Sequence, residues 1–389
     1  MQVLHLVKTM HGAAWAWRQI SVLRECGLDV TIACPEDGPM RARYEAAGAS
    51  VVQAEVALPH RAPWRIPSAL RQVRELVGDL KPDLIHSHFV TTTLALRLAL
   101  GRSHPTPRIF QVPGPLHLGN AFFRRADRLT MGPQDYVIGS CQWTCRKYRE
   151  LGVSADRVFL SYYGTDVDAY SGKQSGALRA ELAVGSGPLV GMIAWMYPPK
   201  LLLGQRRGLK GHEDFLHALQ RVFAAHPSAR AVIVGEQWGP GRRYQRQLQA
   251  LATRLHGYKV LFLGPRDDVP SIYADLDLAL HPSLSENVGG AVESLLAACP
   301  TVASNVGGLP DLVQDGVTGW LVPPRRTDLL AEAMLDALAR PEEARLRAHR
   351  GRELARVMFD VNRTGREIVA IYGKLMGSPQ GVALGDTIA

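Results

Sequence analysis

The 389-residue sequence has no long hydrophobic run and few cysteines, and both absences limit what the protein can be. No apolar run approaches the roughly 20 residues that a membrane-spanning helix needs. The apolar opening, MQVLHLVKTM, lacks a basic leader and a small-residue cleavage site, so it predicts a first strand and not a signal peptide. The five cysteines are odd in number and mostly scattered, which favours reduced cytosolic thiols over disulfides or a metal site.

Common nucleotide and catalytic signatures are also missing: there is no GxGxxG, P-loop, nucleophile elbow or paired metal-ligand spacing. Hydrophobic residues make up 46% and charged residues 21%, as in ordinary globular chains, which excludes global disorder and a fibrous protein. Lys and Arg number 45 against 36 Asp and Glu, and this surplus favours anionic partners such as phosphates, acidic lipids or nucleic acid. Nucleic acid is the weakest of these because no basic motif is interleaved with aromatic residues.

The length predicts two or three domains, at roughly 100–200 residues per domain. Short β-branched runs alternate with amphipathic stretches, and this alternation predicts parallel sheets covered by helices on both faces. The alternation stops at 165–186, where Gly, Ser and Asp carry no apolar period, and it restarts with PLVGMIAW at 188–195. We therefore expect two Rossmann-like, doubly wound α/β domains, 1–170 and 187–358, with a linker between them.

Open α/β sheets bind ligands beyond the carboxyl ends of their strands, so functional residues are expected in the segments that follow strands. One such segment leads into a helix expected at 289–298, which Ser285 or Asn287 can cap. Gly289 and Gly290 leave backbone N–H groups bare at the start of this helix, where an anion is favoured.

Two acidic residues belong to the same segment. Glu293 lies one turn into the expected helix, and its carboxylate can accept two hydroxyl hydrogen bonds, which suits a ribose diol. The alternative is that Glu286 and Glu293 are surface acids that compensate the helix dipole, and that the two glycines form only a tight turn.

A cationic loop precedes another expected helix, in MYPPKLLLGQRRGLKGHEDF. Guanidinium and ammonium groups beside a cleft can clamp a diphosphate, whereas the alternative is a solvated basic loop. The loop's cations are Lys200, Arg206, Arg207 and Lys210, the last followed by Gly211.

In the first domain, Gly12 follows the first strand and lets the backbone approach a ligand closely. His86 and His88 end the DLIHSH strand on one face, and His117 follows the VPGP turn. A histidine in such a place is either a catalytic group or a satisfied polar residue of the core. The two alternatives remain open for His88 and His117.

Taken in order, these segments resemble glycosyltransferase family 4, a family of retaining enzymes with the GT-B fold. The resemblance runs over nearly the whole chain. It is carried by KPDLIHSH (81–88), LKGHEDFLHAL (209–219) and SENVGGAVESLLAACPTVASNVGGLPDLVQDGVTGWLVPP (285–324). It implies two sheets facing a central cleft, and a last helix, 362–376 within the segment 359–389, that crosses back to the N-terminal domain.

The resemblance also implies roles for individual residues. Lys210 contacts the donor diphosphate, Glu293 binds the ribose, and Gly289 and Gly290 line the donor sugar and phosphate. The basic loop and the loop after the first strand add further residues that are implied to bind the donor. The full set is Gly12, Arg206, Arg207, Lys210, Gly289, Gly290 and Glu293. The catalytic candidates are Lys210, Glu286, His117 and His88.

The chain departs from the family pattern at several positions. Family members pair Glu293 with a glutamate eight positions earlier, but Ser285 stands there and Glu286 is displaced by one. Many members have His-Gly where this chain has Pro113-Gly114, with His117 three residues on. The family arginine after the first strand of the second domain is absent from GMIAWMYPP, and we expect Arg206 or Arg207 to take its role.

The function implied is transfer of a sugar from a nucleoside diphosphate, commonly UDP, to a hydroxyl of a glycan, lipid-linked or small-molecule acceptor, as in polysaccharide biosynthesis. No metal, other cofactor or protein nucleophile is required. Asp275 and Asp277 have the spacing of the DxD motif of metal-dependent sugar transferases. We expect them instead at the end of a helix and the start of a strand. The alternatives are a nucleotide-sugar epimerase of the same fold and a non-catalytic nucleotide-sugar-binding protein.

The expected location is the cytoplasm or, peripherally, the inner membrane face. Basic residues of the first domain could meet a lipid-linked acceptor at such a surface, or could be solvated helix faces. They are Arg61, Arg65, Arg71, Arg74, Arg124, Arg125 and Arg128.

Overall fold

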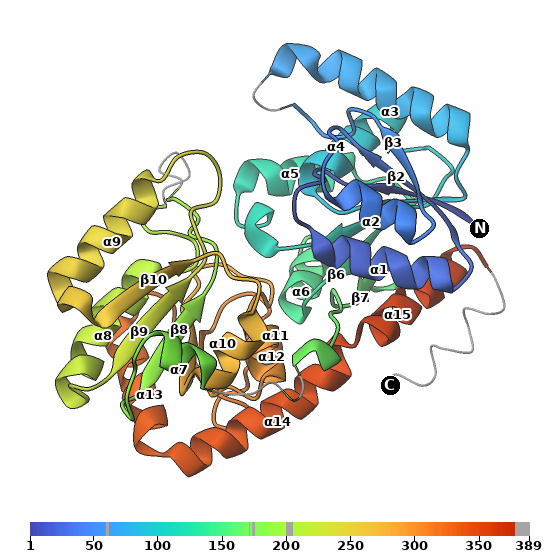
Figure 1. Ribbon diagram of the computed structural model, residues 1–389. Coiled ribbons are helices and arrows are strands. Elements are labelled where there is room, and N and C mark those ends of the chain that lie inside the picture. The colour runs from blue at the N-terminus through green and yellow to red at the C-terminus, as the bar shows by residue number, and fades with distance from the viewer. Residues whose placement is uncertain (60–61, 171, 173–175, 200–204, 378–389) are drawn as a thin grey trace. The chain divides into compact units, whose positions relative to one another are not determined.

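The computed structural model describes residues 1–59, 62–170, 172, 176–199 and 205–377. The chain divides into two compact units: one comprises Met1–Asp166 with the C-terminal stretch from Met358, and the other comprises Val167–Val357. Arg61 and Lys200 lie outside the described residues. Both units are doubly wound α/β structures, as the alternation of strands and helices predicted (Figure 1).

The first unit contains a seven-stranded parallel sheet in the order β3-β2-β1-β4-β5-β6-β7. Its strands are β1 (Gln2–Leu6), β2 (Asp29–Cys34), β3 (Ser50–Gln53), β4 (Leu84–Ser87), β5 (Arg108–Val112), β6 (Asp135–Gly139) and β7 (Val158–Leu160). Its α-helices before the second unit are α1 (Ala14–Glu25), α2 (Met40–Ala46), α3 (Ile66–Leu80), α4 (Val90–Leu100), α5 (Ala121–Thr130) and α6 (Gln142–Glu150).

Alternation along β1 shows why both faces of this sheet are covered. Val3 packs into a core with residues of α1 and of the C-terminal helix, whereas Leu4 and Leu6 pack with residues of α3 and α4. Successive side chains of a strand point to opposite faces of the sheet. A strand with apolar side chains on both faces therefore needs a layer of helices on each side.

The second unit contains a six-stranded parallel sheet in the order β10-β9-β8-β11-β12-β13. Its strands are β8 (Leu189–Ile193), β9 (Arg230–Val234), β10 (Val260–Gly264), β11 (Leu278–His281), β12 (Thr301–Ser304) and β13 (Trp320–Val322). Its α-helices are α7 (Ala177–Glu181), α8 (His212–Ala225), α9 (Arg243–His256), α10 (Val269–Asp275), α11 (Ala291–Leu296), α12 (Leu309–Leu312), α13 (Thr327–Ala339) and most of α14 (Pro341–Phe359).

The boundary between the two units, at Asp166 and Val167, falls within the expected linker, 165–186, which also contains the short helix α7 of the second unit. The carboxylate of Asp275 accepts hydrogen bonds from the backbone N–H groups of Gly176 and Leu178 and so satisfies the start of α7. Asp275 is the last residue of α10 and Asp277 immediately precedes β11, which confirms their expected places. Asp277 pairs with Arg179 and accepts from the N–H of Leu189.

The last helix, α15 (Val361–Leu375), belongs to the first unit and packs against α1. Gly365 lies at this contact, where an added Cβ would come within 2.5 Å of Cγ1 of Val22. Tyr372, also on α15, is fully buried in the core that contains β1 and α1. Long-range packing by a C-terminal helix therefore completes one face of the first sheet.

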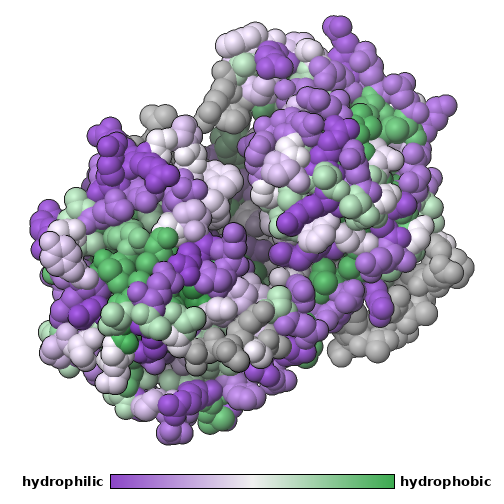
Figure 2. Space-filling view, in the orientation of Figure 1, coloured by the Kyte–Doolittle hydropathy of each residue, from purple (hydrophilic) through white to green (hydrophobic). Residues whose placement is uncertain are grey.

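Hydrophilic residues cover much of the face in view in Figure 2, with smaller apolar patches between them. Among the described residues, no helix combines the length and the apolarity needed to cross a bilayer. The five cysteines, all within the described ranges, carry free thiols.

Candidate functional site: a lysine, an acidic turn and a glycine pair

In the second unit, the segment that ends at Gly211 and the turn after β11 lie against each other. The N–H of Leu284 donates to the carbonyl of Leu209 at 2.8 Å. Gly211 has a φ of 75°, and an added Cβ would collide with the carbonyl oxygen of Pro282. Only glycine meets both conditions, so this residue lets the basic segment approach the carboxyl end of β11.

Lys210 and Glu286 form an ion pair at this approach. The exposed fractions of their side chains are 17% and 13%, so the pair is largely shielded from bulk water. Glu286 also accepts from the hydroxyl of Ser283 at 3.3 Å and from the N–H of Asn287 at 3.1 Å. Such shielding strengthens the electrostatic interaction of the ammonium group with any anion that reaches it.

Gly289 and Gly290 follow directly and bring the backbone close to this ion pair. Gly289 has a φ of 46°, and an added Cβ would lie 2.8 Å from the carboxyl carbon of Glu286. An added Cβ at Gly290 would lie 3.2 Å from the hydroxyl oxygen of Tyr273 and 3.3 Å from Cε1 of His281. The structure thus places Gly289 against the carboxylate that pairs with Lys210, and Gly290 against Tyr273 and His281.

The helix that follows is shorter than expected, and its cap differs from the prediction. The expected helix at 289–298 is α11, Ala291–Leu296, with Gly290 at its N-cap and no side-chain hydrogen bond there. Capping by Ser285 or Asn287 is therefore wrong, because the left-handed Gly289 turns the chain before either side chain reaches the helix start. The Oδ1 atom of Asn287 is buried and accepts no hydrogen bond from the described residues, which leaves it open to a ligand donor.

Glu293 lies in the first turn of α11 and is partly buried. Its charge acts on the neighbouring Tyr273, whose pKa is raised chiefly by burial and secondarily by Glu293. The predicted ribose-binding acid therefore belongs to the same turn-and-helix segment as Gly289 and Gly290.

The other predicted cations differ in their surroundings. Arg207 forms an ion pair with the buried carboxylate of Asp214 in the first turn of α8, so its charge has a structural partner. Arg206 is exposed. Of the predicted cations that the structure describes, Lys210 is the one that lies at the turn containing Glu286.

Two buried histidines flank Lys210, and sequence reasoning did not single them out. Burial, with a smaller contribution from the charge of Lys210, lowers the pKa of His212 and of His281 to about 3. His281 also shares a hydrogen bond with the hydroxyl of Ser294 at 3.1 Å. Both imidazoles are therefore neutral at physiological pH and add no positive charge to that of the lysine.

Three aromatic residues beside this site were also missed: Trp195 and Tyr197 after β8, and Trp238 after β9. The Trp238 ring lies 5.4 Å from the Trp195 ring and 5.7 Å from the Tyr197 ring, centroid to centroid. Their position after strand ends was a usable signal, but nothing in the sequence indicated that residues about 40 positions apart would form one cluster.

In the first unit, Gly12 lies in the exposed loop between β1 and α1 with a φ of 78°. An added Cβ at Gly12 would meet no atom within 4 Å. The conformation favours glycine, and the space around Gly12 leaves room for a ligand to approach the backbone.

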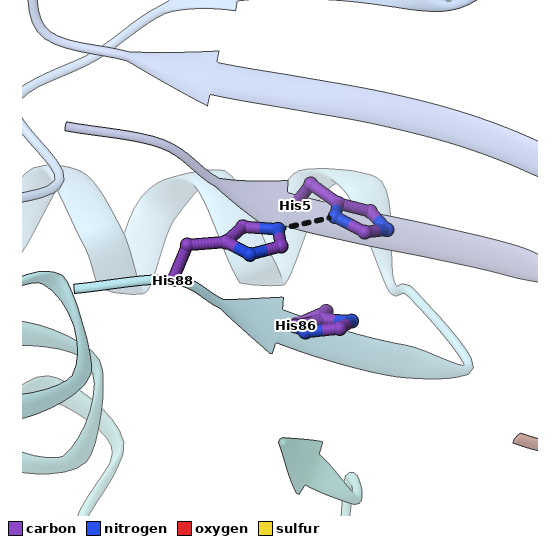
Figure 3. A group of neighbouring side chains, drawn as sticks. All are labelled: His5, His86 and His88. Carbon is purple, nitrogen blue, oxygen red and sulfur yellow. Dashed lines mark hydrogen bonds between the residues drawn. The ribbon is translucent and has the colours of Figure 1, made fainter. Parts of the chain in front are cut away.

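His88 is buried and lies beside His5 and His86, which are also buried (Figure 3). Its Nε2 atom is 2.9 Å from Nδ1 of His5, and its Nδ1 atom is 3.0 Å from the hydroxyl of Tyr163. His86 bonds instead to the hydroxyl of Tyr372, which is also 3.3 Å from His5. These contacts tie β1 and β4 to α15.

The nitrogen atoms of His5, His86 and His88 lie within 4.8 Å of one another, which raises the question of a metal site. The three rings are stacked, with interplanar angles of 18° to 29°, so their in-plane lone pairs do not converge on one point. Burial lowers the pKa of His5 to about 3 and that of His86 and His88 well below the usual value. The group is better described as a neutral, hydrogen-bonded stack than as a ligand set.

His117 belongs to a different buried network. Its Nε2 atom is 3.1 Å from the hydroxyl of Tyr148 and 3.5 Å from Asp127. Burial by itself would raise the pKa of Asp127, but Arg97, His117 and Tyr148 together hold it at about 2. Arg97 also bonds to Asp135, which pairs with Arg108. These contacts place His117 in an ionic core of the first unit.

Two family models match the chain. A model described as glycosyl transferase 4-like domain matches residues 12–164, and one described as glycosyl transferases group 1 matches residues 201–340. The two matches cover most of the chain and fall in different units.

Similar proteins carry related names. A D-inositol 3-phosphate glycosyltransferase from Saccharomonospora viridis is 29% identical over 324 residues, covering 78% of this chain and 72% of that protein. A protein of the same name from Mycobacteroides abscessus is 33% identical over 188 residues, but the match covers only 47% of this chain and 40% of that protein.

Solved structures share the whole architecture. HepE from Anabaena in complex with UDP-glucose superimposes with a TM-score of 0.77 at 22% identity, covering 96% of this chain and all of that chain. Sucrose-phosphate synthase from Thermosynechococcus elongatus gives 0.80 at 17% identity, covering 97% of this chain and 99% of that chain. At these identities the likeness shows the GT-B fold.

Proposed function

The chain belongs to the family 4 glycosyltransferases, and from this premise we propose that it transfers a sugar, with retention, from a nucleoside diphosphate to an acceptor hydroxyl. UDP is the proposed carrier, because the HepE structures hold UDP and UDP-glucose. The second unit is the proposed donor domain and the first unit the proposed acceptor domain.

The observation that carries this proposal is the ion pair of Lys210 with Glu286 beside Gly289 and Gly290. A shielded lysine is suited to diphosphate oxygens, and a carboxylate next to it is suited to sugar hydroxyls. Glu293 in the same segment is the proposed ribose contact. Together these groups are proposed to contact the diphosphate, the sugar and the ribose of a nucleotide sugar.

The proposed reaction breaks the bond between the anomeric carbon and the diphosphate oxygen, and the electron pair leaves with the diphosphate. The acceptor oxygen forms its bond on the same face of the sugar, and its proton passes to the departing diphosphate. Lys210 stabilises the growing negative charge, with Arg206 as the second proposed cation. Preorganised charge of this kind is often the largest single contribution to catalysis.

We propose that no metal is required. The two carboxylates that imitate a DxD motif have structural partners: Asp275 binds backbone N–H groups at the start of α7, and Asp277 pairs with Arg179. Lys210 instead supplies positive charge at the diphosphate. His88 and His117, buried in networks of the first unit, are proposed to support the acceptor side by holding its strands and loops in place.

For the acceptor, a glycan, a lipid-linked sugar or a small molecule such as an inositol phosphate all present the required hydroxyl. A peripheral membrane contact is supported by α5, which exposes Phe122 and Leu129 on a helix that also carries Arg124, Arg125 and Arg128. Apolar side chains among cations are typical of helices that lie on an anionic membrane surface.

The test is Lys210→Ala, assayed by UDP release and by sugar transfer to a panel of acceptors. We expect turnover to fall by about 10²–10³, since one preorganised electrostatic group is lost. Lys147→Ala is the matched control, because Lys147 forms an exposed pair with Glu150 on α6. Normal turnover in folded Lys210→Ala would overturn the proposal.

Product analysis separates the rival functions. Interconversion of the donor sugar without transfer would indicate an epimerase, and nucleotide binding without any turnover would indicate a non-catalytic sensor. A glycosidic product that retains the donor's anomeric configuration is the outcome expected here.

A further inference from the structure

We infer that Trp195, Tyr197 and Trp238 form an aromatic platform that binds a pyranose ring of the acceptor. The inference rests on the proposed function, because it places the acceptor sugar next to the diphosphate-binding lysine. It goes beyond that function, which assigned the acceptor to the first unit, by naming the acceptor's chemistry and by giving residues of the second unit a part in selecting it.

The platform is built on an extension of the sheet. Beyond β8 and β9 the two segments continue to pair: the Met196 N–H donates to the backbone carbonyl of Glu236 at 2.8 Å, and the Trp238 N–H donates to the backbone carbonyl of Met196 at 3.1 Å. Met196 is fully buried, so the alternation of an extended chain puts Trp195 and Tyr197 together on the opposite side. The rings are therefore held by paired backbone and not by a free loop.

The two indoles are unusually exposed for their size. Trp195 is 42% exposed and Trp238 is 46% exposed, although tryptophan is highly buried on average. Their rings meet edge to face, at 82°, which forms a corner with two apolar surfaces. Clustered exposed aromatics on a rigid support are typical of ligand sites.

The platform adjoins the proposed donor site. The charges that act on Tyr197 are those of Lys210 and Glu286, although its pKa is raised mainly by burial. An added Cβ at Gly208 would lie 2.9 Å from the carbonyl oxygen of Tyr197, so the basic segment passes directly beside the platform. The three rings therefore lie at the diphosphate end of the site.

Chemistry and position together indicate the occupant. A pyranose ring presents a face of C–H groups that packs on an aromatic ring while its hydroxyls remain in water. The platform supplies ring faces and no charged group, which suits a neutral sugar better than a phosphate. A nucleobase is less suitable, since the base lies beyond the ribose, whereas the charges that act on Tyr197 are those of Lys210 and Glu286, the groups proposed to bind the diphosphate and the sugar.

The test uses Trp195→Ala and Trp238→Ala, with Trp238→Phe as the conservative variant. Tyr258→Ala is the matched control, because Tyr258 is 93% exposed and precedes β10, at the opposite end of the sheet. The probes are UDP and UDP-glucose by calorimetry, and methyl glucopyranoside, galactopyranoside and mannopyranoside in the presence of UDP. Glycoside binding is followed by the NMR signals of the indole N–H groups.

We expect at least one methyl pyranoside to shift the signals of Trp195 and Trp238. Each alanine variant should bind that glycoside about tenfold more weakly, an effect of the size found for stacking on one aromatic ring. Trp238→Phe should retain most of the affinity, Tyr258→Ala all of it, and UDP binding should stay within about twofold. Thermal unfolding of each variant checks that the exposed substitution leaves the fold intact.

Other outcomes overturn the inference. A tenfold loss of UDP affinity in the alanine variants would assign the platform to the nucleobase. Unchanged UDP binding with a lost preference for UDP-glucose would assign it to the donor sugar. Absence of any glycoside-dependent shift would deny it a sugar, whereas absence of UDP binding to the unmodified chain would be a failure of the proposed function itself.

Discussion

At the scale of single residues, the displaced acid Glu286 is the main departure from the family pattern. Its carboxylate pairs with Lys210 and lies against Gly289. A glutamate at the family position, which Ser285 occupies here, would have to reach the same two groups from one residue earlier in the chain. Glu286 thus pairs with the lysine that we propose binds the donor diphosphate. The pair holds Lys210 in place, and under the proposed function it would compete with the diphosphate for the ammonium group.

This competition leads to a prediction for Glu286→Gln. Loss of the negative charge frees Lys210, so UDP should bind several-fold more tightly, while turnover should fall because the sugar loses a carboxylate partner. Calorimetry with UDP and steady-state kinetics with UDP-glucose check the two effects separately. Weaker UDP binding together with normal turnover would show that Glu286 acts neither as competitor nor as sugar contact.

At the scale of elements, the contact of α15 with α1 depends on the absence of a side chain at Gly365. A methyl group there meets the branched side chain of Val22, which has little freedom to move aside within a packed helix pair. The same helix carries Tyr372, whose hydroxyl bonds to His86 and approaches His5. Displacement of α15 would therefore disturb both the core and the histidine stack.

We predict that Gly365→Ala lowers the free energy of unfolding by about 1–3 kcal/mol, although alanine is the better helix former. The matched control is Gly78→Ala in α3, where an added Cβ meets no atom within 4 Å. That change should raise stability by about 0.5–1 kcal/mol. Urea denaturation of both variants measures the contrast, and equal effects would contradict the steric argument.

At the scale of the whole molecule, five of the histidines that are buried in the described part of the chain make stability depend on pH. Burial lowers the pKa of His5, His212 and His281 to about 3, and that of His86 and His88 well below the usual value near 6.5. Below about pH 6.5 the unfolded chain therefore binds more protons than the folded chain. Stability is present at neutral pH and is lost as the pH falls from about 6.5 toward 3.

Each of these histidines can contribute up to about 1.4 kcal/mol per pH unit within that window. We predict that the free energy of unfolding, measured in urea, decreases steeply between pH 7 and pH 5. His217→Gln, at an exposed position of α8, should leave the profile parallel to that of the unmodified chain. A flat profile over this range would contradict the burial of neutral imidazoles.

Much of the fold followed from the sequence because its signals are local. The alternation of apolar runs with amphipathic stretches placed the strands, and the separate restart at 188–195 predicted a second sheet. Gly211 and Gly289 mark places where the backbone takes a left-handed turn, and the sequence displays them directly. The predictions for Lys210 and Glu293 rest on signals of the same local kind, because their motifs are continuous along the chain.

Only the tertiary structure decided which distant groups meet. It paired Lys210 with Glu286, placed Tyr372 against His86, and joined Trp238 to Trp195 and Tyr197. It also placed His88 and His117 inside networks that no local pattern indicated. Periodicity and backbone preference are properties of neighbouring residues, whereas burial and pairing depend on how separate strands and helices pack, so the sequence by itself determined the sheets and the tertiary structure decided the site.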